Sequence, residues 1–232
     1  MRQAAQAPEL IREIERVDQR LVEQAGRYAA SILADVAGRR GALSGRIAPL
    51  APKMRMAGPA VTVEVRPGDN LMIHAALALV KPGDVLVVDG KGDLSSALMG
   101  EIMCRQAMVL GVSGVVIDGA VRDSEAIREL GIPVYAAGLN PNGPTKSVPG
   151  RVNHPISVGG VSVCPGDLVV GDADGVTVIE RGKVAALLPL AAEKLVAEAR
   201  RMVEVQDPRT CRPAWLEGAL RAAGVLNEGD AL

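Results

Sequence analysis

Apolar side chains recur along the chain with two different periods, and together these predict an alternation of strands and helices. Short apolar, β-branched runs predict strands at residues 58–65, 85–89, 114–117, 132–136, 168–170 and 176–179, with a further strand or two within 155–163. Helical spacing predicts helices at 72–80 and 124–130, and another in which Ala97, Leu98, Ile102, Met103 and Ala107 share a face before Gly111. This order is typical of a mixed α/β domain with parallel and antiparallel strand pairs.

Helices are also predicted at both ends of the chain. Apolar residues fall on one helical stripe within residues 1–25, namely Leu10, Ile11, Ile14, Val17 and Leu21. A second helix is predicted at 28–38, a long amphipathic helix at 183–205 and a short one near 216–223. Since no linker is long enough to separate two domains, we expect one domain over residues 1–232, with N-terminal helices within 1–40 and a C-terminal helix and tail at 183–232.

Turns separate these elements. Pro-Gly-Asp occurs at 67–69, 82–84 and 165–167, and each copy predicts a turn because proline sets φ at the first central position and glycine allows positive φ at the second. We read this repeat as structural. Residues 172–175 predict a hairpin-like turn, rather than a calcium loop, and residues 138–150 form the longest irregular segment.

Composition narrows the class of protein. Apolar residues make up 48% of the chain but aromatic residues only 1%, so Val, Leu, Ile, Ala and Met must form the core. A net charge of −1 gives no electrostatic support for a nucleic-acid partner. The three cysteines lack metal-ligand spacing and indicate free thiols in a reducing compartment. Without a signal-like or membrane-spanning apolar run, the sequence predicts a soluble cytoplasmic protein with no membrane partner.

Arg122-Asp123 is the strongest candidate for chemistry, because it follows the buried strand 114–117. The carboxyl ends of strands in an open α/β sheet are where ligands bind. Aspartate oxygens suit Mg²⁺ or Mn²⁺, and an arginine fork suits a carboxylate or a developing enolate. The alternative is a plain surface ion pair. If a helix begins at Gly100-Glu101 beside this pair, its first-turn N–H groups could hold a keto-acid carboxylate.

Other polar residues carry weaker hypotheses. His74 lies among apolar neighbours and is predicted to be a satisfied core histidine, while His154 precedes a proline in an exposed loop. Lys91 and Lys146 lie in glycine-rich loops and could form a Schiff base, although solvated lysines are the simpler interpretation. No glycine-rich phosphate-binding motif occurs in the sequence, so a nucleotide has no support from a motif.

The sequence resembles the RraA-like family, which includes class II aldolases that act on 4-hydroxy-4-methyl-2-oxoglutarate and 4-carboxy-4-hydroxy-2-oxoadipate. The hallmark of that family is a glycine and an acidic residue, then twenty residues, then Arg-Asp; here these are Gly100-Glu101 and Arg122-Asp123. Further matches lie between Ser31 and Glu180, namely residues 57–63, Pro67-Gly68-Asp69-Asn70, Met72-Ile73-His74, 82–87, Asn153-His154-Pro155 and 171–176.

The resemblance implies a fold of stacked mixed β layers flanked by helices, assembled as a homotrimer or homohexamer with sites at subunit boundaries. It implies that Asp123 holds Mg²⁺ or Mn²⁺, that main-chain amides of Gly100, Glu101, Ile102 and Met103 bind the carboxylate of an oxo-acid substrate, and that Arg122 stabilises an enolate. The implied products are pyruvate and a second oxo-acid. Oxaloacetate decarboxylation, which passes through the same enolate, is the implied side activity.

Two departures from the family pattern bear on the activity. Glu101 replaces the aspartate usual in the aldolases, which leaves the substrate open. The aldolases also borrow a glutamate from a neighbouring subunit, for which Glu193, Glu198 and Glu204 are candidates. The alternatives are a regulator that inhibits a ribonuclease by protein contact and a lyase of the same fold that acts on another acidic substrate. The long C-terminal extension with Trp215 favours the aldolase branch, because the regulators resemble shorter chains.

Overall fold

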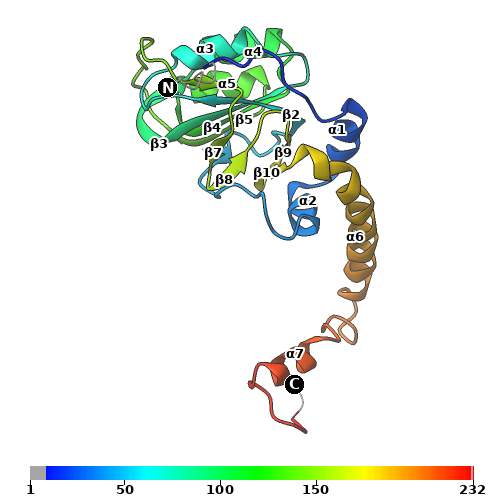
Figure 1. Cartoon of the computed structure of the whole chain (residues 1–232). Helices are drawn as coiled ribbons and strands as arrows, with labels where there is room; N and C mark the ends of the chain where they lie inside the picture. The colour runs from blue at the N-terminus through cyan, green and yellow to red at the C-terminus, as the bar shows by residue number, and fades with distance from the viewer. Residues whose placement is uncertain (1–8, 231) are drawn as a thin grey trace, which may run out of the picture. The chain divides into compact units, whose positions relative to one another are not determined.

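The structure is a computed structural model that describes residues 9–230 and 232 (Figure 1). Two compact units are distinguished, the first ending at Ala191 and the second covering Ala192–Leu232. The expectation of one domain over residues 1–232 stays a prediction. The strands are β1 (Ala48–Pro49), β2 (Met56–Glu64), β3 (Val85–Met99), β4 (Gly114–Val121), β5 (Val134–Leu139), β6 (Arg151–Val152), β7 (Ile156–Val158), β8 (Val161–Val163), β9 (Leu168–Asp172) and β10 (Gly175–Ile179). The helices are α1 (Gln19–Ala25), α2 (Ala30–Val36), α3 (Leu71–Leu77), α4 (Glu101–Val109), α5 (Ser124–Leu130), α6 (Val184–Glu204) and α7 (Leu216–Ala222).

The first unit is built on a mixed sheet with strand order β1-β5-β4-β3-β2-β9-β10. Strands β2 to β5 run parallel, whereas β1 pairs antiparallel with β5, and β9 pairs antiparallel with both β2 and β10. The helices α3, α4 and α5 connect successive parallel strands and lie together over one face of the sheet (Figure 1). The predicted mixed α/β fold with flanking helices is therefore confirmed.

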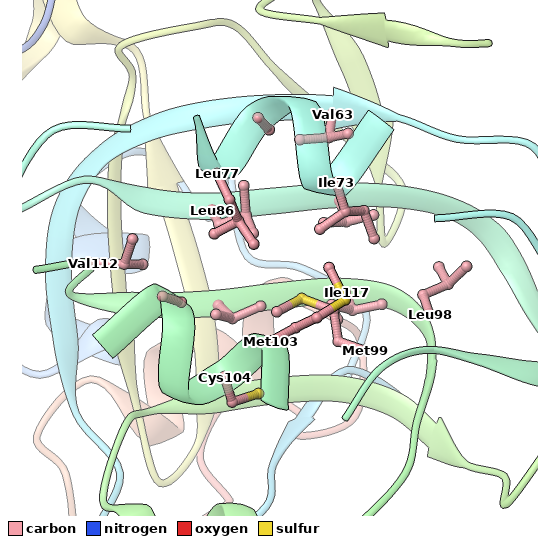
Figure 2. Packing of buried hydrophobic residues seen from close by; sticks show 14 of the residues in the cluster. Val63, Ile73, Leu77, Leu86, Leu98, Met99, Met103, Cys104, Val112 and Ile117 are labelled. Atoms are coloured by element: carbon pink, nitrogen blue, oxygen red, sulfur yellow. The ribbon is translucent and has the colours of Figure 1, made fainter. Parts of the chain in front are cut away.

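Both faces of the parallel strands are buried, because apolar side chains occupy successive positions. Leu86 and Val88 pack in the cluster beneath the helices, while the alternate residues Val85 and Val87 pack in a second cluster on the opposite face. Figure 2 shows Ile73 and Leu77 of α3 and Met103 of α4 meeting strand side chains in the first cluster. Successive residues of a strand point to opposite faces, so an unbroken apolar run requires cover on both.

The N-terminal helix begins later than the sequence predicts. The first eight residues lie outside the described part of the chain, and residues 11–18 are irregular, so helix α1 starts only at Gln19. The Ile11 N–H donates to Val152 O (3.2 Å) and the Val17 N–H donates to Gly166 O (3.1 Å). Apolar residues at every third position occur in irregular segments that lie on a protein surface as well as in helices. Here the hydrogen bonds to the body favour the irregular segment, and residues 11–18 are called the strap below.

Strand β3 corrects one further expectation, whereas the Pro-Gly-Asp turns confirm another. The spacing predicts Ala97 and Leu98 on the helix, but they belong to the last part of strand β3, which continues through bulges beyond Asp89 to Met99. Extended Gly100 then separates strand from helix. The three Pro-Gly-Asp turns do form, with positive φ at each glycine, but their aspartates are almost fully buried and tie distant segments together. The Asp84 carboxylate, for example, accepts two hydrogen bonds from the strap residue Arg16 (2.7 and 2.9 Å).

The second unit contains the C-terminal part of α6 and the helix α7. Arg201 of α6 donates to Thr210 O (3.0 Å) and Glu204 Oε2 (2.9 Å), which closes the following turn. The predicted long helix and the short final helix are both present. Among the described residues, no helix has both the length and the apolar character needed to cross a membrane.

Candidate functional site

The site forms where two neighbouring parallel strands end. Register pairs Met99 of β3 with Val121 of β4, and the Arg122 N–H donates to Met99 O at 3.0 Å. The chain then turns into α4 after Gly100 and into α5 after Asp123. The two halves of the Gly100-Glu101 and Arg122-Asp123 pattern therefore lie side by side, and helix α4 begins at Glu101, as the argument for carboxylate binding requires.

Asp123 has an unusual backbone conformation that directs its carboxylate away from its own helix. Its φ of 55° and ψ of 38° lie in the left-handed region, which aspartate and asparagine tolerate better than most residues. The side chain does not cap α5; instead Oδ2 accepts the Glu101 N–H at 3.1 Å. Arg122 Nε lies 3.5 Å from the same oxygen, and the two side chains are 42% and 43% exposed. The carboxylate therefore keeps free lone pairs that face solvent.

Gly100 lies against this carboxylate, and its lack of a side chain creates the room. A Cβ at this position would lie 2.4 Å from Asp123 Oδ2 and 3.0 Å from Arg122 Cγ. Because the backbone of Gly100 is extended, any residue could adopt its conformation. The glycine is therefore required by contact with Asp123 and Arg122, and not by backbone strain.

A cavity of about 260 Å³ opens beside these residues. Four segments of the chain line it, with the residues Asn70, His74, Leu98, Met99, Gly100, Ile102, Met103, Arg122, Asp123, Gly143, Pro144 and Lys146. Of the predicted site residues, Glu101 alone is missing from this lining. Its Oε1 atom accepts a hydrogen bond from Arg105 Nε (2.9 Å) and forms an ion pair with the same guanidinium, and its main-chain N–H donates to Asp123.

His74 differs from the expectation of a satisfied core histidine. It lines the cavity, and its Nε2 atom is buried with no hydrogen-bond partner among the described residues. Asn70, one turn earlier, donates to Leu98 O (2.9 Å) while its Oδ1 atom is likewise buried and unpaired. Burial, and then the positive charge of Lys146, lower the pKa of His74. The cavity wall thus presents two polar atoms that nothing in the described chain satisfies.

The two candidate lysines fall in different places. Lys91 lies away from the cavity, where its Nζ contacts Asp89 Oδ2 (2.6 Å) and Glu64 Oε1 (2.9 Å). Burial lowers the pKa of Lys91, but these hydrogen bonds outweigh it and raise the pKa overall, which disfavours a nucleophilic amine. Lys146 lines the cavity, and no ion pair within residues 9–230 involves it.

Asp123 also decides whether a divalent cation fits. No group of three or more His, Cys, Asp or Glu side chains converges within the described residues, so an all-protein cage is not offered there. Mg²⁺, however, commonly uses one or two carboxylates and keeps several waters. A half-exposed carboxylate with one N–H partner suits that mode of binding.

Sequence reasoning missed Asn70, Asp69 and the place of Lys146 within the cavity. Asn70 and Lys146 line the cavity with Arg122 only through the fold, and Asp69 is linked to it only by hydrogen bonds to the residues beside Lys146. No spacing along the chain encodes these contacts. The signal that could have identified them lies in the runs Pro67-Gly68-Asp69-Asn70 and Met72-Ile73-His74, which match the family resemblance but carry no chemical motif.

Comparisons with known proteins place the chain among RraA relatives. The sequence profile described as RraA-like: Aldolase/RraA matches residues 18–178. A protein of Halalkalibacterium halodurans named "Putative 4-hydroxy-4-methyl-2-oxoglutarate aldolase" is 41% identical over 175 residues, which cover 75% of this chain and 83% of that protein.

Two solved structures have a similar fold. Streptomyces coelicolor RraAS2, described as an unusual member of the RNase ES inhibitor RraA protein family, is 33% identical with a TM-score of 0.73, covering 81% of this chain and 99% of its own. The RNA-processing inhibitor RraA from Thermus thermophilis is 34% identical with a TM-score of 0.60, covering 65% of this chain and 92% of its own.

Proposed function

The chain belongs to the RraA-like family, and we propose that within it this protein is a divalent-metal-dependent aldolase that cleaves a 4-hydroxy-2-oxo diacid. The proposed substrates are 4-hydroxy-4-methyl-2-oxoglutarate and 4-carboxy-4-hydroxy-2-oxoadipate, and the proposed products are pyruvate and a second oxo-acid. The observation that carries the proposal is the half-exposed Asp123 carboxylate, which lies beside Arg122 and the first turn of α4 at one cavity.

Substrate binding is assigned to the start of α4. First-turn N–H groups of a helix have no intrahelical partners and attract anions. The Glu101 N–H is already bonded to Asp123, so the amides of Gly100, Ile102 and Met103 are the ones left for the pyruvyl carboxylate. This narrows the set Gly100, Glu101, Ile102 and Met103 that the resemblance implies.

Bond cleavage is assigned to Arg122 with a water. The C4 hydroxyl proton leaves through the water, the C3–C4 bond breaks, and its electron pair moves onto the C2 carbonyl as an enolate. The Arg122 guanidinium stabilises that oxygen, and protonation at C3 then gives pyruvate. Asp123 would hold Mg²⁺ or Mn²⁺, which when bound supplies Lewis-acid polarisation of the keto oxygen. Oxaloacetate should lose CO₂ by way of the same enolate.

Two alternatives have specific support. The names of the solved relatives, inhibitors of RNase ES and of RNA processing, favour a regulator that contacts a ribonuclease. A lyase of the same fold on another acidic substrate is favoured by Glu101 in place of aspartate.

We also propose a trimer or hexamer; Glu193, Glu198 and Glu204 are exposed on α6 and could serve a neighbouring subunit.

The test measures pyruvate release from oxaloacetate and from 4-hydroxy-4-methyl-2-oxoglutarate, with Mg²⁺ and again with EDTA. Turnover of both substrates that EDTA abolishes is the expected result. Turnover that survives EDTA would replace the metal mechanism with a Schiff base, for which Lys146 is positioned in the cavity. No turnover of either substrate would contradict the proposal and favour the regulator or the other lyase.

A further inference from the structure

Building on the proposed function, we propose that Lys146 recognises the second carboxylate of the substrate and that Asp69 is the positioning residue that holds Lys146 at the cavity. Neither role follows from the chemistry of bond cleavage, which Arg122 and Asp123 account for. Together they determine which oxo-acids the site accepts.

Lys146 is the cavity cation that remains available. Arg122, the other cation in the lining, lies 3.5 Å from the Asp123 carboxylate, whereas no carboxylate of the described chain pairs with Lys146. After burial, the positive charge of Lys146 is the second cause that lowers the pKa of His74, which lines the same cavity. A site with two cations and one aspartate, plus the amides of a helix N-terminus, is complementary to a dianionic substrate rather than to a monoanion.

The roles already assigned to the other groups of the cavity leave the second carboxylate for Lys146. The first turn of α4 serves the pyruvyl carboxylate, and Arg122 serves the C2 oxygen beside it. Lys146 comes from the 140–150 segment, which approaches the cavity from a different part of the chain together with Gly143 and Pro144. It is therefore matched to the end of the substrate that leaves as the second oxo-acid.

Asp69 holds the backbone on both sides of Lys146. Its Oδ2 atom accepts hydrogen bonds from Thr145 Oγ1 (2.7 Å), the Ser147 N–H (2.8 Å) and the Val148 N–H (3.1 Å). Its Oδ1 atom accepts the Leu71 N–H (2.9 Å) at the start of α3, the helix that carries His74. The carboxylate is 1% exposed. One buried group thus fixes the lysine and the helix on that side of the cavity.

Fixing this backbone matters because residues 140–150 contain no helix or strand. Burial raises the pKa of Asp69, but the four hydrogen bonds outweigh it and lower the pKa to about 2. The Asp69 carboxylate is therefore ionised at neutral pH and keeps these hydrogen bonds. An ordered loop lowers the entropy cost of immobilising the lysine on its ligand, so the benefit should appear in binding of the second carboxylate.

The experiment compares kcat/KM for 4-hydroxy-4-methyl-2-oxoglutarate with that for 4-hydroxy-4-methyl-2-oxopentanoate, in which a methyl group replaces the second carboxylate. Lys146→Gln should lower the ratio of the two values by about tenfold, the loss of one charge-assisted bond. Lys146→Arg, which keeps the charge, should retain most of the ratio. Lys53→Gln removes another exposed lysine outside the cavity lining and should change neither value. An unchanged ratio in Lys146→Gln would overturn the inference.

Asp69 is tested by its dependence on Lys146. Asp69→Asn should lower the same ratio, and the double variant Asp69→Asn/Lys146→Gln should have the ratio of Lys146→Gln alone, because Asp69 acts through the lysine. If Asp69→Asn folds poorly, Thr145→Val takes its place in the experiment. This variant removes one of the four hydrogen bonds to Asp69 and should also lower the ratio. Equal losses on both substrates in Asp69→Asn and Thr145→Val would show a merely structural role and overturn the assignment of Asp69.

Deuterium exchange at C3 of pyruvate separates this inference from the proposed function. Exchange needs an enolate but no second carboxylate. A wild-type protein that neither exchanges pyruvate nor cleaves the diacid would overturn the proposed function, and this inference with it. Wild-type exchange and cleavage, combined with an unchanged substrate ratio in Lys146→Gln, would overturn this inference alone.

Discussion

Asp123, which lines the cavity, and Asp69, which holds the segment that carries Lys146, have opposite surroundings. Asp69 is almost fully buried and accepts four hydrogen bonds, so that its lone pairs are used by the protein itself. Asp123 is 43% exposed, accepts one amide N–H and lies at ion-pair distance from Arg122. A carboxylate whose oxygens are fully hydrogen-bonded by the protein positions other groups, whereas one with free lone pairs can bind a cation or substrate.

The strongest test of the difference between the two aspartates is to remove the charge of Asp123. Asparagine keeps the shape and tolerates the left-handed backbone, whereas alanine would add backbone strain. We expect Asp123→Asn to lower kcat/KM for pyruvate release by roughly 10²–10³-fold or more. Because the side chain is half exposed, the free energy of unfolding should change by only about 0.5 kcal/mol.

The matched control for that variant is Asp174→Asn, which removes an exposed carboxylate from the turn between β9 and β10. It should leave both activity and stability unchanged. Urea unfolding and steady-state kinetics on the two variants suffice. Wild-type turnover in Asp123→Asn would remove Asp123 from the mechanism, and a large loss of stability would mean that it, too, is structural.

Gly100→Ala displaces the Asp123 carboxylate without changing its charge. The new Cβ would lie 2.4 Å from Oδ2, so the carboxylate or the Gly100 backbone must move. A displacement of about 1 Å at a reacting group can cost about 10²-fold in rate, and we expect a loss of up to that size in kcat/KM. The control is Gly45→Ala, because a Cβ at Gly45 would have no neighbouring atom within 4 Å. Equal kinetics in both variants would show that Asp123 need not be held where the structure has it.

The smallest expected effect is the pH dependence that comes from Asp69. Its pKa falls from an ordinary value of 3.8 to about 2 in the folded protein, so the unfolded chain binds more protons between these values. The stabilisation is therefore present above about pH 4 and is lost as the pH falls toward 2. At pH 7 the free energy of unfolding of Asp69→Asn should be lower than that of wild type by on the order of 2 kcal/mol, and this difference should shrink in acid.

Urea unfolding at pH 7, 4 and 2.5 measures this difference. A constant gap between Asp69→Asn and wild type across the three values would mean that the Asp69 pKa is not depressed.

Much of the fold was predictable because local signals determine it. Gly111 and Gly131 do follow the ends of α4 and α5, and the apolar run at 114–117 is a strand buried on both faces. The pairing of Gly100 with Arg122 was also accessible, since a strand, a helix and a parallel strand return the chain to the same sheet edge.

The failures share a physical cause, namely contacts that spacing along the chain does not encode. Residues 11–18 have helical periodicity, yet they form no helix, and hydrogen bonds to Val152 and Gly166 hold them against the body. The sequence predicts Asp69 only as part of a turn, although its partners lie more than seventy residues further along. The apolar neighbours of His74 in the sequence predict a satisfied side chain, while in the structure it faces the cavity.

The parallel pairing of β3 with β4 gives a physical meaning to the interval of twenty residues between Glu101 and Arg122. The chain leaves the site along α4, reverses direction at residues 110–113 and returns to the site along β4. The interval of twenty residues is therefore the combined length of the helix, the turn and the strand. Residues added at the reversal would lengthen the interval without moving its two ends. Residues added between Met99 and Glu101 would separate Gly100 from Asp123. A search for distant proteins with this chemistry should therefore hold the two ends fixed and leave the length of the interval free.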